Sequence, residues 1–108
     1  MTKCEFFRSE GRITGFSVSG HSGYAEAGSD IVCAAISAAV SLAECTINDV
    51  CGGKAKVRVK EADARITLTL PTVCEEEDTI QDVLTGLMLY LISLRDDYPD
   101  YIEVVMEV

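Results

Sequence analysis

The stretch that decides the fold is residues 57–70, which read Val57-Arg58-Val59-Lys60-Glu61-Ala62-Asp63-Ala64-Arg65-Ile66-Thr67-Leu68-Thr69-Leu70. Residues 57–60 and 65–70 alternate apolar and polar side chains, which is the period of a half-buried β-strand. The short acidic segment 61–64 joins the two runs. The stretch therefore predicts a β-hairpin with one face toward a core.

Strand patterns also stand at both ends of the chain. Residues 2–9 and 12–19 have strand character, and the Glu10-Gly11 pair between them predicts a hairpin turn. Residues 101–108 supply a last alternating strand. Together these patterns predict about five strands.

Two helices are predicted between the strands. The first runs from about Ile31 to Val50 and stops at Gly52-Gly53, a usual C-terminal signal. The second follows an acidic run, residues 75–78, and the pair Thr79 and Asp82 resembles a capping box. Its core stripe is Ile80, Val83, Leu84, Leu87, Leu91 and Leu94, and Met88 and Ile92 widen it. That width indicates either deep burial or a homodimer contact.

The order is strand, strand, helix, strand, strand, helix, strand (ββαββαβ). It predicts one α+β domain over residues 1–108, with two helices packed on a mostly antiparallel sheet. The formal net charge is −9, which argues against direct binding to nucleic acid and suits a basic protein partner. An acidic surface that serves solubility alone fits the same number.

Cysteine usage and hydropathy indicate the compartment. The chain has five irregularly spaced cysteines, which fit reduced thiols better than a disulfide framework. No apolar run reaches about 18 uninterrupted residues, and the N-terminus has no apolar signal core. We therefore expect a cytoplasmic protein with no membrane span. The cysteine spacing does not fit a zinc site, and we expect no metal and no cofactor.

The candidate catalytic side chains lie within residues 20–35. This segment holds the only histidine, His21, and places Cys33 near the start of the first predicted helix. An imidazole that takes the proton of a thiol leaves a nucleophilic thiolate. Cys33 and His21 are therefore a candidate thiol nucleophile and its candidate base. Cys33 as an ordinary helix-core residue and His21 as a hydrogen-bonded loop residue remain open.

Neighbouring residues have candidate supporting roles. Asp30 is favoured as the N-cap, which would put Cys33 in the first turn, where free amides stabilise a thiolate or an oxyanion. Asp30 alternatively orients His21. Ser37 follows Cys33 by one turn on the same face, close enough to hydrogen-bond within the site or back to its own helix.

The connecting loop carries Gly20, Gly23 and Tyr24. The glycines fit tight turns, and Gly23 alternatively serves as a hinge of a lid that orders when peptide binds. Tyr24 either touches substrate or lies in solvent.

Two blocks, Gly-His-Ser-Gly-Tyr at 20–24 and Asp-Ile-Val-Cys-Ala-Ala-Ile-Ser at 30–37, resemble the paired motifs of the ribosomal-processing cysteine proteases, the Prp family. The resemblance implies that His21 and Cys33 are catalytic. It also implies a gating role for the loop and a substrate that is the N-terminal extension of large-subunit ribosomal protein twenty-seven.

Two other functions fit the same residues. One is a non-catalytic ribosome-assembly or interaction protein, which would bind without turnover. The other is a thiol-based redox or acyl-transfer enzyme, which would need a resolving cysteine such as Cys4 or Cys45 near Cys33.

Overall fold

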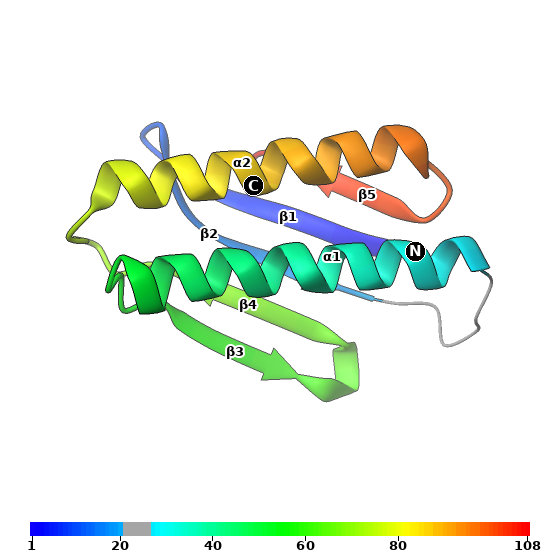
Figure 1. Cartoon of the computed structure of the whole chain (residues 1–108), viewed down its shortest axis with the longest axis horizontal. Helices are drawn as coiled ribbons and strands as arrows, with labels where there is room; N and C mark the ends of the chain where they lie inside the picture. The colour runs from blue at the N-terminus through cyan, green and yellow to red at the C-terminus, as the bar shows by residue number, and fades with distance from the viewer. Residues whose placement is uncertain (21–26) are drawn as a thin grey trace.

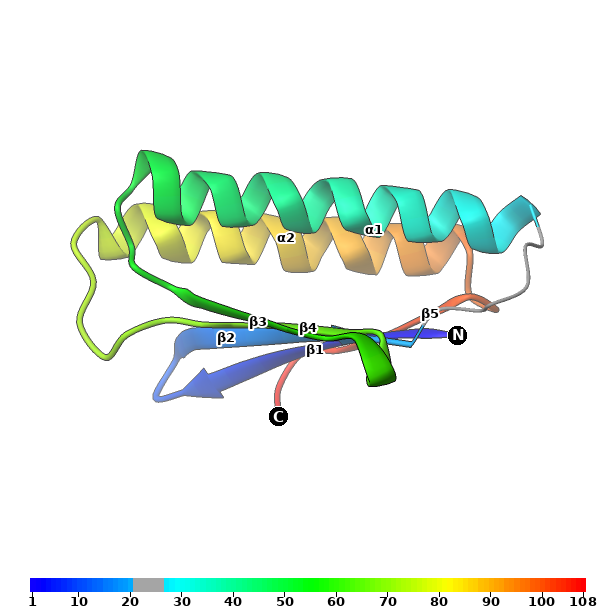
Figure 2. The same cartoon turned by 90° about the horizontal axis from the view of Figure 1, so that it is seen from below.

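The computed structural model describes residues 1–20 and 27–108, and these form two layers, with two long helices on one face of a five-stranded sheet (Figure 1, Figure 2). The helices are α1 (Ala27–Cys45) and α2 (Glu77–Asp97). The strands are β1 (Thr2–Ser9), β2 (Arg12–Ser19), β3 (Lys56–Lys60), β4 (Arg65–Thr69) and β5 (Ile102–Val105). The predicted element order and the α+β class are confirmed.

The sheet has the order β3-β4-β2-β1-β5, so β3 and β5 are its edges. Both predicted hairpins form, β1 with β2 and β3 with β4, and β2 also pairs antiparallel with β4. The fourth pairing, β1 with β5, is parallel. The sheet is therefore mostly antiparallel, as predicted.

The core lies between the helices and the inner face of the sheet. Phe6 and Phe16 are directly opposite in the β1–β2 register, and their ring centroids are 6.0 Å apart. The largest fully buried side chains also include Ile47, Leu84 and Leu91 from the helical layer. The opposite face of the sheet has no helix over it in the described part of the chain (Figure 2).

The first helix differs from its prediction at both ends. It begins at Ala27, four residues before Ile31, and α-helical geometry ends at Cys45. A π-helical turn, Thr46–Val50, then continues to the predicted end, and Gly52 follows with φ +63°. A left-handed glycine is a common helix terminator because it carries no Cβ.

The second helix begins at Glu77 rather than after Thr79, so the predicted capping box is wrong. Its N-cap residue, Glu76, has φ +55° and makes no side-chain capping hydrogen bond. Glu77 and Asp78 occupy the first turn, where carboxylates complement the helix dipole. Of the residues that widen the apolar stripe, Met88 is buried in the core, so deep burial is the correct reading there.

One segment of the described chain, Ile31–Val50, is long and apolar enough to cross a membrane by length and composition alone. Val32, Ile36 and Ile47 of this segment are buried in the core cluster, whereas Ile31, Leu42 and Val50 are exposed. Packing on the sheet accounts for part of this apolar pattern. One such helix is weak evidence for a membrane span, because core helices of soluble proteins pass the same test.

Candidate active site

Cys33 lies on α1 in the wall of a groove of about 450 Å³. Its neighbour Val32 and Ile36, one turn further, are buried in the core, so the thiol sits at the border between core and surface. Ser37 lines the same groove, which confirms that it shares a face with Cys33. The groove is lined by Thr2, Val18, Gly20, Cys33, Ile36, Ser37, Val59, Lys60, Glu61, Ala64, Arg65 and Ile66.

The β3–β4 hairpin lies at the edge of the sheet beside α1, and neither long helix covers β3 (Figure 1). Val59 pairs with Ile66 on the face that carries the core residue Leu68, and Val59 is 68% exposed. Alternation along the strands therefore provides an apolar shelf beside α1. The sequence predicted this hairpin but not its place beside Cys33, which only the tertiary fold provides.

Two charged residues of the β3–β4 hairpin that line the groove have their side-chain partners on the outer face of the sheet or in the turn. Arg65 Nη1 donates a hydrogen bond to Ser17 Oγ over 2.8 Å, and lies 3.9 Å from a carboxylate oxygen of Glu5. Lys60 Nζ lies 3.1 Å from a carboxylate oxygen of Asp63, at the turn that joins β3 to β4. Lys60, Glu61 and Arg65 line the groove together with apolar residues, and a few polar groups within an apolar lining are typical of a ligand-binding site.

Gly20 also lines the groove and ends β2 with φ +74°. A Cβ at this position would lie 2.9 Å from the backbone oxygen of Met1. Only glycine fits both the left-handed conformation and this close approach. This position immediately precedes His21 in the sequence.

Three predicted site residues, His21, Gly23 and Tyr24, lie outside the described residues. Asp30 lies within α1, because the helix begins at Ala27, and its assignment as the N-cap is therefore wrong. For the same reason Cys33 is the seventh residue of the helix rather than a member of its first turn. The helix dipole acts chiefly within the first turn, so free N-terminal amides do not explain activation at this cysteine.

The other thiols are held protonated or out of the groove. Burial raises the pKa of the Cys4 thiol to about 12. A hydrogen bond with Asp49 raises the pKa of Cys45, and burial together with the nearby Glu77 raises that of Cys74. Since a thiolate is the reactive form, these three thiols are poor nucleophiles at neutral pH.

The redox alternative needed a resolving cysteine near Cys33. Cys45 lies 12 positions further along the helical segment, which at about 1.5 Å per residue places it about 18 Å away. That separation excludes a direct disulfide. Cys4 is fully buried, so its thiol is not available for exchange in the folded protein.

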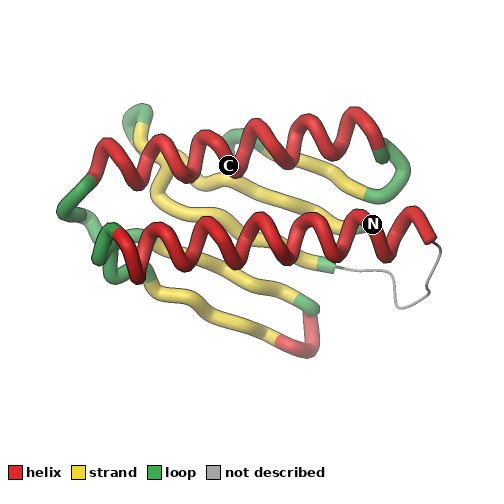
Figure 3. Tube along the Cα trace, in the orientation of Figure 1, coloured by secondary structure: helices red, strands yellow, loops and turns green. Residues whose placement is uncertain are grey.

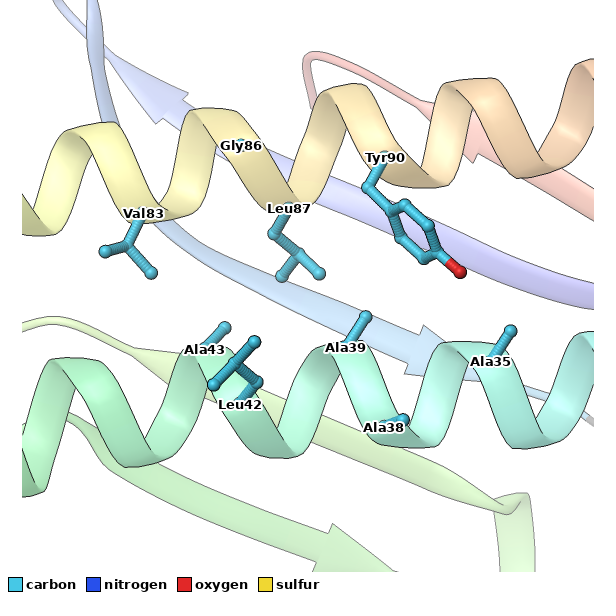
Figure 4. Close-up of a pocket in the computed structure, with 9 residues that line it drawn as sticks. All are labelled: Ala35, Ala38, Ala39, Leu42, Ala43, Val83, Gly86, Leu87 and Tyr90. Atoms are coloured by element: carbon cyan, nitrogen blue, oxygen red, sulfur yellow. The ribbon is translucent and has the colours of Figure 1, made fainter.

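A second groove of about 440 Å³ lies on the other flank of α1, between the two helices (Figure 4). Alanines of α1, with Leu42, face Val83, Leu87 and Tyr90 of α2 across it. The two helices lie side by side along its length (Figure 3), and the residue-number colours of Figure 1 show that they run antiparallel. This lining has no thiol and no carboxylate, so the Cys33 groove is the candidate active site.

A family model described as Cysteine protease Prp matches residues 1–103. The chain belongs to the cysteine protease Prp family. This confirms the resemblance drawn from the two sequence motifs, and with it the enzyme class, a cysteine protease. The interpretations as a non-catalytic interaction protein or a redox enzyme are not retained.

Solved structures of similar fold include Prp family proteins. The essential ribosomal processing protease Prp from S. aureus, in complex with a substrate peptide, is 20% identical with a TM-score of 0.86, and the match covers 98% of this chain and 99% of that one. A protein from Streptococcus mutans is 22% identical with a TM-score of 0.88 over 100% of this chain and 96% of its own. At these identities the likeness shows a shared fold. No curated protein matches the chain.

Proposed function

We propose that this Prp family member cleaves peptide bonds with a dyad of Cys33 as nucleophile and His21 as base. Its proposed substrate is the N-terminal extension of large-subunit ribosomal protein twenty-seven. The observation that carries the proposal is the position of Cys33 in the wall of a mostly apolar groove that also has polar lining residues. Three of the other four thiols have raised pKa values, which lowers their thiolate fractions below that of an ordinary thiol.

In the proposed mechanism His21 takes the proton of the Cys33 thiol. The sulfur attacks the carbonyl carbon of the scissile bond, and the carbonyl oxygen carries the negative charge of the tetrahedral intermediate. As the carbon–nitrogen bond breaks, protonated His21 gives its proton to the leaving amine. A water molecule then attacks the thioester and releases the carboxylic acid and the thiol.

A proteolytic role for the groove agrees with what similar proteins bind. Solved structures of the S. aureus protease hold a substrate peptide and a covalently linked product peptide. Here the shelf of Val59 and Ile66 would accept apolar side chains next to the scissile bond. The net charge of −9 favours the approach of a basic ribosomal protein.

Alkylation of Cys33 by iodoacetamide tests the dyad separately from the substrate. With His21 as its base, Cys33 keeps a high rate below pH 7, and His21→Ala moves the pH dependence of that rate toward that of an ordinary thiol. The double variant His21→Ala/Cys33→Ala should cleave the peptide no more slowly than Cys33→Ala alone, because the two residues act as a unit. An unchanged pH profile in His21→Ala would contradict the dyad.

We further propose that the protein is a cytoplasmic homodimer. Met88 is buried and therefore does not supply the contact, whereas Leu42, Leu89 and Tyr90 expose apolar surface on the helical layer. These side chains offer a surface for a second copy. Sedimentation equilibrium of the wild type and Leu42→Glu tests this, and a wild-type monomer at every concentration would contradict it.

A further inference from the structure

We infer that Glu61 is a specificity-determining residue, whose carboxylate binds a lysine or arginine side chain of the peptide substrate close to the scissile bond. The inference rests on the proposed function, because it adds a charge preference to the groove that holds Cys33. Glu61 lines that groove, and among the described residues of the lining it is the only acid.

The backbone of the β3–β4 hairpin places Glu61 on the groove side of the sheet. Side chains alternate between the two faces of a strand, and Val59 lies on the inner face, opposite Ile66. Lys60 keeps extended dihedral angles, φ −117° and ψ 98°, so the alternation continues to the next residue. The 3-10 turn Glu61–Asp63 therefore begins with Glu61 on the same face as Val59.

Lys60 and Arg65 also line the groove, but their charged ends have other partners. The two residues pair with each other in the β3–β4 register, which places them on the face of the sheet opposite Glu61. Lys60 Nζ lies 3.1 Å from a carboxylate oxygen of Asp63, and Arg65 Nη1 lies 3.9 Å from one of Glu5. The two cations of the lining are therefore already compensated.

The carboxylate of Glu61 has no such partner. Within residues 1–20 and 27–108 its side chain forms no ion pair and no hydrogen bond, and the residue is exposed. Its backbone carbonyl accepts a hydrogen bond from the amide of Ala64 over 3.1 Å, which closes the turn without using the side chain. The groove therefore presents one uncompensated negative charge within a mostly apolar lining, and a cationic side chain complements it.

The size of the groove limits how far this cation lies from the scissile bond. Cys33 and Glu61 line one groove of about 450 Å³. A volume of that size is on the order of 8 Å across, the length of two to three residues of extended peptide at about 3.3 Å each. The cation therefore lies within about four residues of the cut. The net charge of −9 attracts a basic protein as a whole, whereas Glu61 acts at one position of the substrate.

Cleavage of a peptide series by the full-length protein tests the inference. Each peptide spans the cleavage junction of the host's ribosomal protein twenty-seven. One position at a time carries lysine, glutamine or glutamate, from four residues before the cut to four residues after it. At low salt we expect lysine to raise kcat/KM over glutamine roughly three- to fivefold at one position or two neighbouring ones, and the advantage should shrink as salt is added.

Three variants assign the preference to its residue. Glu61→Gln should remove the lysine advantage, and Glu61→Lys should reverse it in favour of glutamate at the same position. Glu75→Gln is the matched control, because it changes the net charge equally at an exposed residue outside the groove lining, and it should keep the advantage. A change of fold would affect all the peptides alike, so a reversal confined to one position is not the result of a structural role.

The other outcomes separate this inference from the proposed function. Cleavage with no lysine advantage at any position, or an advantage that persists in Glu61→Gln, would overturn the inference and leave the proposed function standing. An advantage that Glu75→Gln reduces as much as Glu61→Gln would belong to the overall charge, which also overturns the inference. No cleavage of any peptide by the wild type would refute the proposed function itself.

Discussion

Gly20 joins the fold to the candidate site, and replacing it with alanine has a calculable cost. The left-handed conformation at φ +74° costs a non-glycine residue about 1–2 kcal/mol. The new Cβ would also lie 2.9 Å from the Met1 carbonyl oxygen, so one of the two backbone segments must shift. We expect Gly20→Ala to lower the free energy of unfolding by about 2–3 kcal/mol and Tm by roughly 10 °C or more.

Two other glycines separate the components of this cost. Gly11 has φ +80° and no atom within 4 Å of an added Cβ, so Gly11→Ala measures the conformational cost alone, about 1 kcal/mol. Gly86 lies inside α2 and also has open space around its Cβ position. Gly86→Ala should therefore stabilise the protein by about 0.5–1 kcal/mol through helix propensity.

Urea unfolding followed by circular dichroism measures the three variants, and peptide cleavage is measured at a temperature where all remain folded. Because Gly20 precedes His21, Gly20→Ala should lose more cleavage activity than Gly11→Ala. If Gly20→Ala were as stable as the wild type and fully active, the argument that this turn positions the site would be refuted.

Further predictions concern reactivity, pH and packing. Iodoacetamide at pH 7 should modify Cys33 first. Cys4, with a pKa of about 12, should react roughly a thousandfold more slowly than a thiol at the ordinary value of 9.0. Mass spectrometry of peptides from timed reactions measures the order in which the thiols are modified. A hydrogen bond from Arg12 lowers the pKa of Glu77, so this pair contributes stability above Glu77's ordinary value of 4.5 and loses it as pH falls through the lower folded value. Glu77→Gln should therefore cost less than about 1 kcal/mol at pH 7 and nothing near pH 2, measured by urea unfolding at both values. Leu91→Ala, at a fully buried position, should lower the free energy of unfolding by about 2–5 kcal/mol, and a smaller loss would contradict the core described here.

Local sequence patterns predicted most of the fold because the elements obey local rules. Alternation predicted the hairpin formed by residues 57–60 and 65–70. In the other hairpin, β1–β2, Glu10 and Gly11 both adopt the positive φ values that a tight turn between strands needs. The helical stripe was found for the same reason, since a period near 3.6 is written in the chain itself.

The starts of the helices were less predictable. Asp30 and Thr79 are both good capping residues, yet each lies inside its helix. Side-chain propensity at a cap contributes only about 1 kcal/mol, and tertiary packing of the helix outweighs it.

The residues that line the groove around Cys33 could not be predicted from local sequence patterns. The groove that holds Cys33 is also lined by Thr2, Val59 and Arg65, because the sheet order brings β1, β3 and β4 beside α1. No spacing in the sequence encodes that contact. Cys33 could be predicted as the candidate nucleophile because a thiol carries this chemistry whatever surrounds it, and that role stays a prediction.

The central claim is that Cys33 cleaves a ribosomal protein extension, and one measurement tests it most directly. Wild type, Cys33→Ala and the matched control Cys45→Ala are incubated with the host's full-length ribosomal protein twenty-seven, and the products are weighed by mass spectrometry. The account predicts a single cut near the N-terminus with wild type and Cys45→Ala, and intact protein with Cys33→Ala. The same cut by Cys33→Ala, or no cut by any of the three, would contradict it.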